Sequence, residues 1–466
     1  MRLMIAGGGG FRVPLVYRVL CQGPFAGLVS ELVLFDVDEQ RLKAIQAVLR
    51  DMPTTPGPRP TIVGCNDLGQ ALTGTDIVFA AIRPGGTAGR IADEGVALAL
   101  GLLGQETTGA GGISYALRSI PRMLELAQGM RRHCPDAWLI NFTNPAGMVT
   151  EALVPVLGNR VIGICDSAGG LAQRAARAAG TPLIEGSLDG VGYYGLNHLG
   201  WLYRLAPHGR DLLPGLLADP SALGSMEEGR LFGQHTLEKL GCLPNEYLYY
   251  YYQTAQATKA IRAQRQTRGA SIHLQQHALY PALVHADDAY SLWDAARRSR
   301  EEGYLAEART NGEQRDESDL AGGGYERVAL SVMRALSAGG TAQLILNVPN
   351  APVLAADGPH DAEVAVPGLP ADAVVEVPAQ VTPDGAVAVA QERPPGPFLT
   401  LMQRVKEVER LTIRAVRDHD REAAVQAFAS HPLVGSELLG RQLLAGYEKE
   451  FPGLAALWSN GRRAGG

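Results

Sequence analysis

The chain has 466 residues, of which 46% are hydrophobic and 19% charged, with a formal net charge of -6. This length exceeds what one hydrophobic core usually covers, so we expect two domains, and the acidic balance without a basic run excludes an electrostatic surface for nucleic acid. We expect neither a membrane span nor a signal peptide, because no apolar run is long enough. Five scattered cysteines indicate a reducing cytoplasm rather than a disulfide framework.

The first predicted strand, residues 2–6, runs into four glycines. Gly7 and Gly9 fit the G-x-G-x-x-G pattern of dinucleotide-binding loops, whereas Arg12 takes the place of the third glycine. Pro14 suits the first turn of a helix, and the following residues continue with helical spacing. A strand, a glycine turn and a helix in this order present backbone N–H groups and a helix dipole to a pyrophosphate. A dinucleotide site is therefore one interpretation of this segment.

The second predicted strand, residues 31–35, ends at Asp36. A carboxylate at this point accepts hydrogen bonds from a ribose diol and repels a 2′-phosphate, which favours NAD over NADP. The alternative is a surface aspartate that caps the next helix. Further buried strands are predicted at 76–82, 138–140 and 161–164, with helical patterns between them. The alternation predicts an α/β fold with a Rossmann-type doubly wound parallel sheet.

Two asparagines follow the strand at 138–140. Because Asn144 precedes a proline, its backbone is kept out of the helical region, so it must lie at the carboxyl end of the strand. Open parallel sheets bind their ligands at this end. The amides of Asn141 and Asn144 can each donate to and accept from a polyhydroxy ligand. The alternative is an Asx-turn that only closes the strand.

A cysteine and a histidine also follow ordered elements. Cys165 and Asp166 come directly after the strand at 161–164, and His198 lies in the segment Gly-Leu-Asn-His-Leu-Gly. A thiolate and an imidazole in such positions could share a divalent transition metal. The alternatives are an inert buried cysteine and a histidine satisfied within the core.

The stretch at 83–118 is rich in glycine and charge. Arg90 and the neighbouring pair Asp93 and Glu94 are expected on the solvent face of a helix. The run Gly-Gln-Glu-Thr-Thr-Gly-Ala-Gly-Gly at 104–112 interrupts two helical patterns. Such a polar loop is either a surface excursion or a wall of a ligand site.

Strand and helix stop alternating after about residue 200. The tyrosine run at 249–252 is expected in the core or at an interface. Tyr325 follows three glycines on the first turn of a predicted amphipathic helix, where a helix dipole could lower its pKa, and ordinary packing is the alternative. A strand at 344–348, a small β region at 351–397 and helices from 398 to about 450 complete the prediction.

Several of these segments resemble the NAD- and metal-dependent glycoside hydrolases of family four. The resemblance covers residues 1 to about 440 and lies in the runs at 104–112 and 135–147, in Cys165 and in the Gly195-Leu-Asn-His198 motif. It implies a Rossmann domain that binds NAD over 1–194. It further implies a lactate-dehydrogenase-like α+β domain over 195–466 for substrate, metal and oligomerisation. The implied cofactors are NAD and Mn²⁺, the implied substrate is a small sugar phosphoglycoside, and the implied assembly is a homodimer or homotetramer.

The resemblance also implies a reaction that differs from two-carboxylate glycoside hydrolysis. Hydride passes from C3 of the sugar to NAD, a base removes the acidified proton at C2, and the aglycone leaves from C1 before water and hydride return. By resemblance Tyr325 is the base, Asp166 the general acid, and the pair Cys165 and His198 the metal ligands. The residues that match the cofactor site are Gly7, Gly8, Gly9, Phe11, Arg12, Asp36 and Arg83, and those that match the substrate site are Arg90, Glu106, Asn144 and Asn197.

Within the family, three short segments resemble the 6-phospho-β-glucosidase branch: Thr107-Thr108, Phe142-Thr143 and His198-Leu199-Gly200. Asp166 departs from this branch, whose members usually carry Asn after the metal cysteine, and matches the α-acting branch. Leu320 departs as well, because the family usually has an arginine there, which leaves Arg83 and Arg12 as candidates for a phosphate clamp.

The prediction is therefore a 6-phospho-β-glucosidase. An α-linked or non-phosphorylated glycoside is the first alternative substrate. An NAD-dependent 2-hydroxy acid dehydrogenase, which needs no metal, and an NAD-sensing binding module are the other classes of protein that the sequence leaves open.

Overall fold

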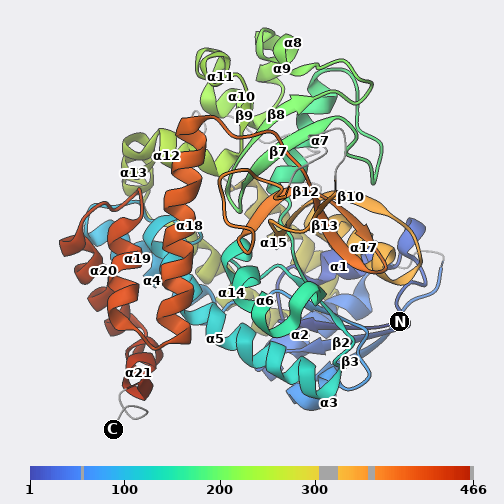
Figure 1. The fold of residues 1–466 in the computed structure, drawn as a ribbon. Helices are drawn as coiled ribbons and strands as arrows, with labels where there is room; N and C mark the ends of the chain where they lie inside the picture. Colours follow the sequence, from blue (N-terminus) through green and yellow to red (C-terminus); the bar gives the residue numbers. More distant parts are fainter. Residues whose placement is uncertain (54–56, 304–323, 355–362, 462–466) are drawn as a thin grey trace.

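The computed structural model describes residues 1–53, 57–303, 324–354 and 363–461 (Figure 1). The strands are β1 Arg2–Ala6, β2 Glu31–Phe35, β3 Thr61–Cys65, β4 Ile77–Ala80, β5 Trp138–Asn141, β6 Val161–Gly163, β7 Val191–Leu196, β8 Leu199–Leu205, β9 Leu243–Pro244, β10 Ala342–Pro349, β11 Val353–Leu354, β12 Val374–Thr382 and β13 Gly385–Val389. The α-helices are α1 Val13–Leu20, α2 Glu39–Asp51, α3 Leu68–Leu72, α4 Gly86–Ala99, α5 Gly109–His133, α6 Ala146–Leu157, α7 Ser167–Ala178, α8 Leu213–Leu217, α9 Pro220–Gly224, α10 Glu227–Phe232, α11 Gln234–Leu240, α12 Tyr249–Tyr252, α13 Thr254–Ala263, α14 Arg268–His285, α15 Ala289–Glu302, α17 Tyr325–Ser337, α18 Gly396–Arg417, α19 Arg421–Ser430, α20 Glu437–Glu450 and α21 Pro452–Gly461. Short 3-10 turns span Gly23–Phe25, Gly158–Arg160 and Glu246–Leu248.

One sheet runs through the molecule in the order β3-β2-β1-β4-β5-β6-β10-β12-β7-β8-β9, with β13 on β12 and β11 on β13. The strands β1 to β6 pair in parallel in the order 3-2-1-4-5-6, which is that of a doubly wound dinucleotide-binding fold. The predicted Rossmann-type sheet is confirmed. The sequence does not predict β3, because this edge strand is largely exposed and lacks an apolar run.

Strands from the second half of the chain extend the same sheet. β10 pairs antiparallel with β6, β12 pairs antiparallel with both β10 and β7, and β7 forms a hairpin with β8. The predicted small β region at 351–397 contains β11, β12 and β13, and the structure shows in addition that β12 is an internal strand of the main sheet. Its position depends on pairing with strands distant in sequence, which no local pattern reveals. The division of the chain at residue 194 stays a prediction.

Alternate residues of each strand enter two apolar cores on opposite faces of the sheet. Leu3 and Ile5 of β1 belong to one core, and Met4 and Ala6 belong to the other. In Figure 1 the carboxyl-terminal helices α18 to α21 lie beside α4 and α5, on the side of the second core. Among the described residues, none of the helices combines the length and apolar composition that crossing a bilayer requires.

The helices α14 and α15 cover the glycine loop between β1 and α1. The hydroxyl of Tyr280 donates a hydrogen bond to the carbonyl of Gly9 at 2.8 Å, and Trp293 Nε1 donates to the carbonyl of Phe11 at 2.8 Å. The sequence offers only charged helical patterns here. The structure shows that this segment supports the loop that the dinucleotide motif predicts.

The expectation that the charges of α4 face solvent is wrong. Arg90, Asp93 and Glu94 are 7%, 0% and 2% exposed. Arg90 Nε lies 2.8 Å from Glu94, and Arg118 Nη2 lies 2.8 Å from Asp93. The hydroxyl of Tyr447 from α20 donates to the carbonyl of Asp93 at 2.9 Å. The charges are buried because α14 and α20 pack over α4, and each charge is compensated by a partner.

Asn141, the last residue of β5, is buried, and its side chain stabilises the turn between β5 and α6. Its side-chain amide donates to the carbonyl of Ala146 at 3.2 Å and to the hydroxyl of Thr150 at 3.1 Å, and its carbonyl accepts from the amide of Thr143 at 2.9 Å. Asn141 is fully buried, so the predicted contact with a polyhydroxy ligand is wrong and the Asx-turn alternative is correct for this residue.

Asn141→Ala is expected to lower the free energy of unfolding by about 2–4 kcal/mol, because it leaves buried backbone groups without partners and opens a small cavity. Urea denaturation measures this change. Asn159→Ala, at an exposed position, is the control and is expected to change stability by less than about 0.5 kcal/mol. Equal stability of Asn141→Ala and the wild-type protein would contradict the structural role.

Candidate active site

A pocket of about 820 Å³ opens at the carboxyl ends of the parallel strands. Its walls come from the glycine loop, the polar loop before α5, the β5–α6 turn, the start of α7, the β7–β8 turn, and the helices α14, α15 and α17. Residues from Gly104 to Thr107 line it, so the polar loop is a wall of the pocket. The segments that the sequence singled out for chemistry lie at or next to this pocket. The segment around Leu320 lies outside the described residues.

The glycine loop makes a tight turn at Gly7, whose φ is +90°. A Cβ atom at Gly7 would lie 2.7 Å from the carbonyl oxygen of Ala81, so a side chain is excluded. The amides of Gly7 and Gly8 donate to the carbonyl of Phe35 at 2.9 and 2.7 Å, and the loop thereby closes against β2.

The loop leaves backbone donors facing the pocket. Gly9 N–H donates to Asp36 Oδ2 at 2.9 Å, whereas the amides of Phe11 and Arg12 have no partner among the described residues. Phe11 and Arg12 line the pocket just before α1, where the helix dipole favours an anion. Gly8, Gly9 and Asp36 do not line the pocket but lie behind Phe11 and Arg12. The Asp36 carboxylate stabilises the loop through its hydrogen bond from Gly9. These donors and the space above Gly7 fit a dinucleotide pyrophosphate.

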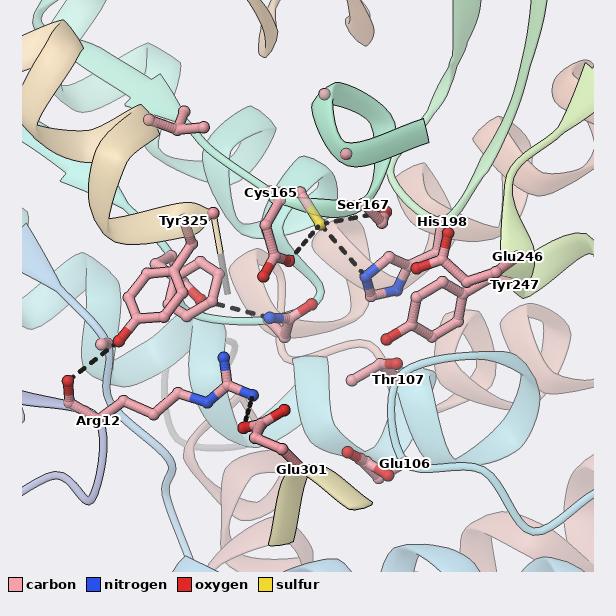
Figure 2. A pocket seen from close by; sticks show the side chains of 18 of the residues that line it. Arg12, Glu106, Thr107, Cys165, Ser167, His198, Glu246, Tyr247, Glu301 and Tyr325 are labelled. Atoms are coloured by element: carbon pink, nitrogen blue, oxygen red, sulfur yellow. Dashed lines mark hydrogen bonds and ion pairs between the residues drawn. The ribbon is translucent and has the colours of Figure 1, made fainter. Parts of the chain in front are cut away.

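The side chains of Cys165 and His198 point toward each other in the wall of the pocket (Figure 2). Cys165 Sγ lies 3.7 Å from His198 Nε2, although the residues are 33 positions apart in the chain. Two ligands of one tetrahedral ion, with bonds of about 2.3 Å to sulfur and 2.0–2.1 Å to nitrogen, lie about 3.6 Å apart. The separation of Cys165 Sγ and His198 Nε2 therefore fits two ligands of one cation.

The environment of the pair suits a metal. Burial lowers the pKa of His198 to about 4, although Glu106 opposes the shift, so the imidazole is neutral at pH 7 with a free lone pair. Burial, followed by the charges of Asp166 and Glu376, raises the pKa of the Cys165 thiol well above its ordinary value. A bound cation would reverse this shift. Among the described residues no group of three His, Cys, Asp or Glu side chains is arranged to hold an ion, so a cation held by this pair would take its other ligands from substrate or water.

The backbone of His198 is strained. Its φ is +64°, in the left-handed region that favours glycine, at the tight turn between β7 and β8. The ring of Tyr247 stacks on the imidazole at a centroid distance of 3.8 Å and an angle of 10°. This stacking fixes the ring orientation. Tyr247 was not singled out by the sequence, because it lies just before the tyrosine run at 249–252, which indicates only packing.

Asp166 and Ser167 complete the surroundings of the sulfur. Asp166 lines the pocket with Oδ1 at 3.9 Å from Cys165 Sγ, and Ser167 Oγ lies at 3.6 Å from the same atom. Asn245 Nδ2 donates to Ser167 Oγ at 2.9 Å. A carboxyl group next to the metal-ligand pair is placed to deliver a proton.

Tyr325 is the first residue of α17, as predicted, and its hydroxyl donates to the carbonyl of Arg12 at 3.0 Å. Its ring stacks on Phe142 at 4.4 Å. The expected lowering of its pKa by the helix terminus is wrong. Burial and the carboxylate of Glu326 raise the pKa of Tyr325 well above its ordinary value, and Arg12 opposes this only in part. In the protein alone the phenol is therefore protonated at neutral pH.

Arg90, Arg83 and Glu106 form a charged group in the lining of the pocket. Arg90 Nη2 lies 2.6 Å from one carboxylate oxygen of Glu106, and Arg83 Nη2 lies 3.8 Å from the other. Burial opposes ionisation of Glu106, but the two arginines prevail and hold its pKa below the ordinary value. Arg83, which was predicted to contact the cofactor, therefore shares the Glu106 carboxylate with Arg90, and both Glu106 and Arg90 were predicted to contact the substrate.

The two predicted substrate asparagines are placed differently. Asn144 lines the pocket, and its buried Oδ1 has no hydrogen-bond partner, so it is free to accept from a ligand. Asn197 lies behind the pocket wall. Its Oδ1 accepts from the amide of Ala146 at 3.0 Å, and its Nδ2 donates to Glu376 at 3.2 Å. The amide of Asn197 thus holds the start of α6 beside His198.

Two buried acids near Cys165 and His198, Glu376 and Glu246, were not among the predicted site residues. Glu376 of β12 accepts from the hydroxyl of Tyr193 at 2.9 Å and from the amides of Asn197 and Asn347. Burial raises the pKa of Glu376 to about 7 and that of Glu246, which lines the pocket, to about 8. A lone Glu in the apolar run Val-Val-Glu-Val is a signal that could have identified Glu376.

The fold and the site define a Rossmann-type enzyme in which a dinucleotide loop and a metal-ligating pair share one pocket. The sequence model described as "Family 4 glycosyl hydrolase" matches residues 2–181, and that of the family's C-terminal domain matches residues 193–434. The chain belongs to glycosyl hydrolase family 4, as the motifs at Cys165 and His198 predicted.

Full-length relatives are similar over nearly the whole chain. A 6-phospho-alpha-glucosidase of Leptotrichia buccalis is 27% identical over 95% of this chain and 96% of its own length. A 6-phospho-beta-glucosidase of Escherichia coli is 27% identical over 98% and 97% of the two chains. The solved 6-phospho-beta-glucosidase of Thermotoga maritima with manganese, NAD⁺ and glucose-6-phosphate superposes with a TM-score of 0.77 at 24% identity, covering 96% of this chain and 98% of its own. This likeness shows a shared fold.

Glu376→Gln is expected to remove a pH dependence of stability. Because the folded-state pKa of about 7 lies above the ordinary value of 4.5, the folded protein holds a proton that the unfolded chain releases in this window. The stability that the protonated Glu376 carboxyl group contributes is fully present below pH 4.5 and is lost as pH rises through 7. Over this range the free energy of unfolding falls by up to about 1.4 kcal/mol per pH unit. Urea denaturation of both proteins from pH 5 to 8 isolates this difference.

Glu450→Gln, at an exposed position, serves as the control and is expected to follow the wild-type profile. Parallel profiles for Glu376→Gln and the wild-type protein would show that the carboxyl group is already ionised at pH 5.

Proposed function

We propose that this family 4 glycosidase hydrolyses 6-phospho-β-glucosides with NAD and a divalent metal, preferably Mn²⁺. The observation that carries the proposal is the 3.7 Å separation of Cys165 Sγ and His198 Nε2 in a pocket that the glycine loop also lines. Relatives named 6-phospho-glucosidases, and a solved neighbour with manganese, NAD⁺ and glucose-6-phosphate, support it. We also propose that residues 1–194 form the NAD-binding domain and 195–466 the substrate domain of a cytoplasmic homodimer or homotetramer.

Several polar groups of the pocket have a role in this reaction. When bound, NAD supplies reversible hydride transfer and the divalent ion supplies positive charge for the sugar oxygens. Asn144 accepts a hydrogen bond from a sugar hydroxyl through its unpaired Oδ1. Cys165 and His198 hold the ion, and the stacked Tyr247 keeps the imidazole oriented toward it.

Tyr325 removes the proton at C2 of the sugar. The Tyr325 hydroxyl donates a hydrogen bond to the Arg12 carbonyl oxygen at 3.0 Å. The Arg12 guanidinium carbon lies 5.3 Å from the centroid of the tyrosine ring. Since burial keeps the phenol protonated in the protein alone, ionisation requires positive charge beside it, and the nearby cation site meets this requirement. Asp166 donates a proton to the departing oxygen from its place next to Cys165.

An α-linked 6-phosphoglucoside is the second candidate substrate. Asp166 favours it, because an aspartate after the metal cysteine resembles the α-acting branch of the family, and Asp166 lines the pocket. The L. buccalis relative is named for the α linkage. Thr107, which lines the pocket, and Phe142, which stacks on Tyr325, belong to the segments that favour β.

The first test is a panel of α- and β-nitrophenyl glucosides, with and without a 6-phosphate, assayed with NAD⁺, Mn²⁺ and a thiol reductant. Hydrolysis of the β-6-phosphate substrate is expected, and EDTA or omission of NAD⁺ should abolish it. Cys165→Ser should weaken Mn²⁺ binding by at least about 100-fold, since even outer-shell changes cost 10–100-fold. Metal-independent oxidation of a 2-hydroxy acid would instead support a dehydrogenase, and hydrolysis of only the α isomer would support the second candidate.

Tyr325→Phe is expected to lower kcat by about 10²–10⁴-fold, as loss of a general base does, while KM changes little. Incorporation of solvent deuterium at C2 of the sugar, followed by NMR, should be lost in parallel. Tyr290→Phe, on α15 and outside the residues that line the pocket, is the matched control. Undiminished C2 exchange in Tyr325→Phe would assign the base to another residue.

A further inference from the structure

One short turn of the chain contacts the surroundings of both metal-ligating side chains. This segment, residues 245–248, comprises Asn245 and the 3-10 turn that follows it, and is here called the ligand turn. The ring of Tyr247 stacks on the imidazole of His198 at a centroid distance of 3.8 Å. The side chain of Asn245 donates to the hydroxyl oxygen of Ser167 at 2.9 Å, and this serine lies beside the sulfur of the other ligand. The ligand turn therefore contacts the histidine directly and the cysteine through one serine.

Hydrogen bonds fix which end of the Asn245 amide faces Ser167. Asn245 Oδ1 accepts from the backbone amide of Tyr247 at 3.0 Å, which only the oxygen of the side chain can do. Nδ2 is therefore the end that donates to Ser167 Oγ. The residue is fully buried, and backbone hydrogen bonds of 2.9 Å with Gly200 and Leu248 hold it in place. The donor that reaches Ser167 is thus set by the fold.

The hydrogen of the Ser167 hydroxyl is available to the sulfur of Cys165. A serine hydroxyl has one hydrogen, and the Nδ2 group that donates to Ser167 cannot accept it. Ser167 Oγ lies 3.6 Å from Cys165 Sγ, which also lies 3.9 Å from Asp166 Oδ1 and 3.7 Å from His198 Nε2. An ionised carboxylate only accepts, and the imidazole is the second ligand. Of these three groups, only the hydroxyl can donate to a thiolate.

The Ser167 hydroxyl is not used to cap the helix that it begins. The cap position of α7 is Asp166, whose side chain makes no capping hydrogen bond. Among the described residues, the contacts of the Ser167 hydroxyl are the amide of Asn245 and the sulfur of Cys165. Ser167 is buried, at 6% exposure. The hydroxyl therefore acts on the sulfur rather than on the helix.

We propose that Ser167, oriented by Asn245, is a positioning residue that shifts the preference of the Cys165–His198 site from soft toward hard divalent ions. A thiolate is a soft ligand, so sulfur and imidazole alone favour Zn²⁺ or Cd²⁺ over Mn²⁺. A hydroxyl that donates to the sulfur withdraws electron density from it, which weakens the bond to a soft ion most. The inference rests on the proposed function only in that this pair of residues holds a divalent ion.

The preference suits the proposed substrate. A hard ion binds oxygen ligands well, and a sugar offers hydroxyl oxygens. A site that held a soft ion tightly through sulfur would favour these oxygens less. The hydrogen bond from Ser167 therefore links the choice of metal to the binding of the sugar.

The test is calorimetric titration of the full chain and of Ser167→Ala with Mn²⁺ and with Cd²⁺, in the presence of NAD⁺ and without added thiol. The same titrations of Cys165→Ser measure binding at other thiols and are subtracted. Ser167→Ala should bind Mn²⁺ about 10-fold more weakly, because the thiolate has lost a donor. Its affinity for Cd²⁺ should change by less than about twofold, because the stronger sulfur bond offsets this loss. The preference for Cd²⁺ over Mn²⁺ should therefore rise by about 5–20-fold.

The sulfur-to-cadmium charge-transfer absorption is a readout that a merely structural change would not move. It should shift to longer wavelength in Ser167→Ala, because loss of the hydrogen bond raises the energy of the sulfur lone pairs. Ser167→Thr keeps the hydroxyl and should restore both the band and the ratio of affinities.

Asn245→Asp is the second variant. It keeps the acceptor for the amide of Tyr247 but replaces the donor with an oxygen that attracts the Ser167 hydrogen away from the sulfur. The ratio of affinities should change in the same direction as in Ser167→Ala. The added charge acts on both divalent ions alike, so the ratio is the informative quantity.

Ser331→Ala is the matched control, because Ser331 lies on α17 and lines the same pocket without a described contact to the sulfur. It is expected to show the wild-type ratio and band. Equal ratios in Ser167→Ala and the wild-type protein would overturn the inference. An equal loss of affinity for both ions would also overturn it and would assign Ser167 a purely structural role.

Two further outcomes separate the inference from the proposed function. If neither ion binds at Cys165 in the wild-type protein, the metal site is refuted and the inference fails with it. If the ratio and the band shift as expected but the protein hydrolyses no glycoside of the substrate panel, the inference stands while the proposed function fails.

Discussion

The chemistry of this protein depends on the insertion of two strands between β6 and β7. The pairing of β10 with β6 and of β12 with β7 fixes the distance between the end of β6, which carries Cys165, and the end of β7, which leads to His198. Glu376 on β12 reinforces the arrangement through Asn197, the residue before the histidine. Without these pairings the thiol and the imidazole would belong to separate parts of the chain, and no metal could join them.

The pocket is built from buried charge rather than from apolar surface alone. Glu106 stands between Arg83 and Arg90, and Arg12 faces Glu301, so most of the charges are stabilised by a partner at close range. Burying a charge costs desolvation free energy, which an opposite charge at close range offsets. If one partner is removed, the other keeps the full desolvation penalty without the offsetting attraction.

The resting protein holds its reactive groups in unreactive states. The thiol of Cys165 and the phenol of Tyr325 keep their protons, because burial disfavours their anions. The His198 backbone is held in a strained conformation by the turn between β7 and β8 and by the stacked Tyr247. Positive charge supplied with the ligands would favour both anions, so assembly of the complex and activation of its groups are linked by electrostatics.

The sequence by itself determined the elements and the places where they end. Apolar runs that stop at glycine, proline or a polar residue located the parallel sheet, the glycine loop and the positions of Cys165, His198 and Tyr325, because these signals are local. The tertiary structure alone decided which of these residues face the pocket. It turned Asn141 inward and left Asn144 free, buried Arg90 under α14 and α20, and brought Arg300 to the glycine loop. Periodicity along one segment cannot show this, because the burial and ionisation of a side chain depend on which distant elements pack over it.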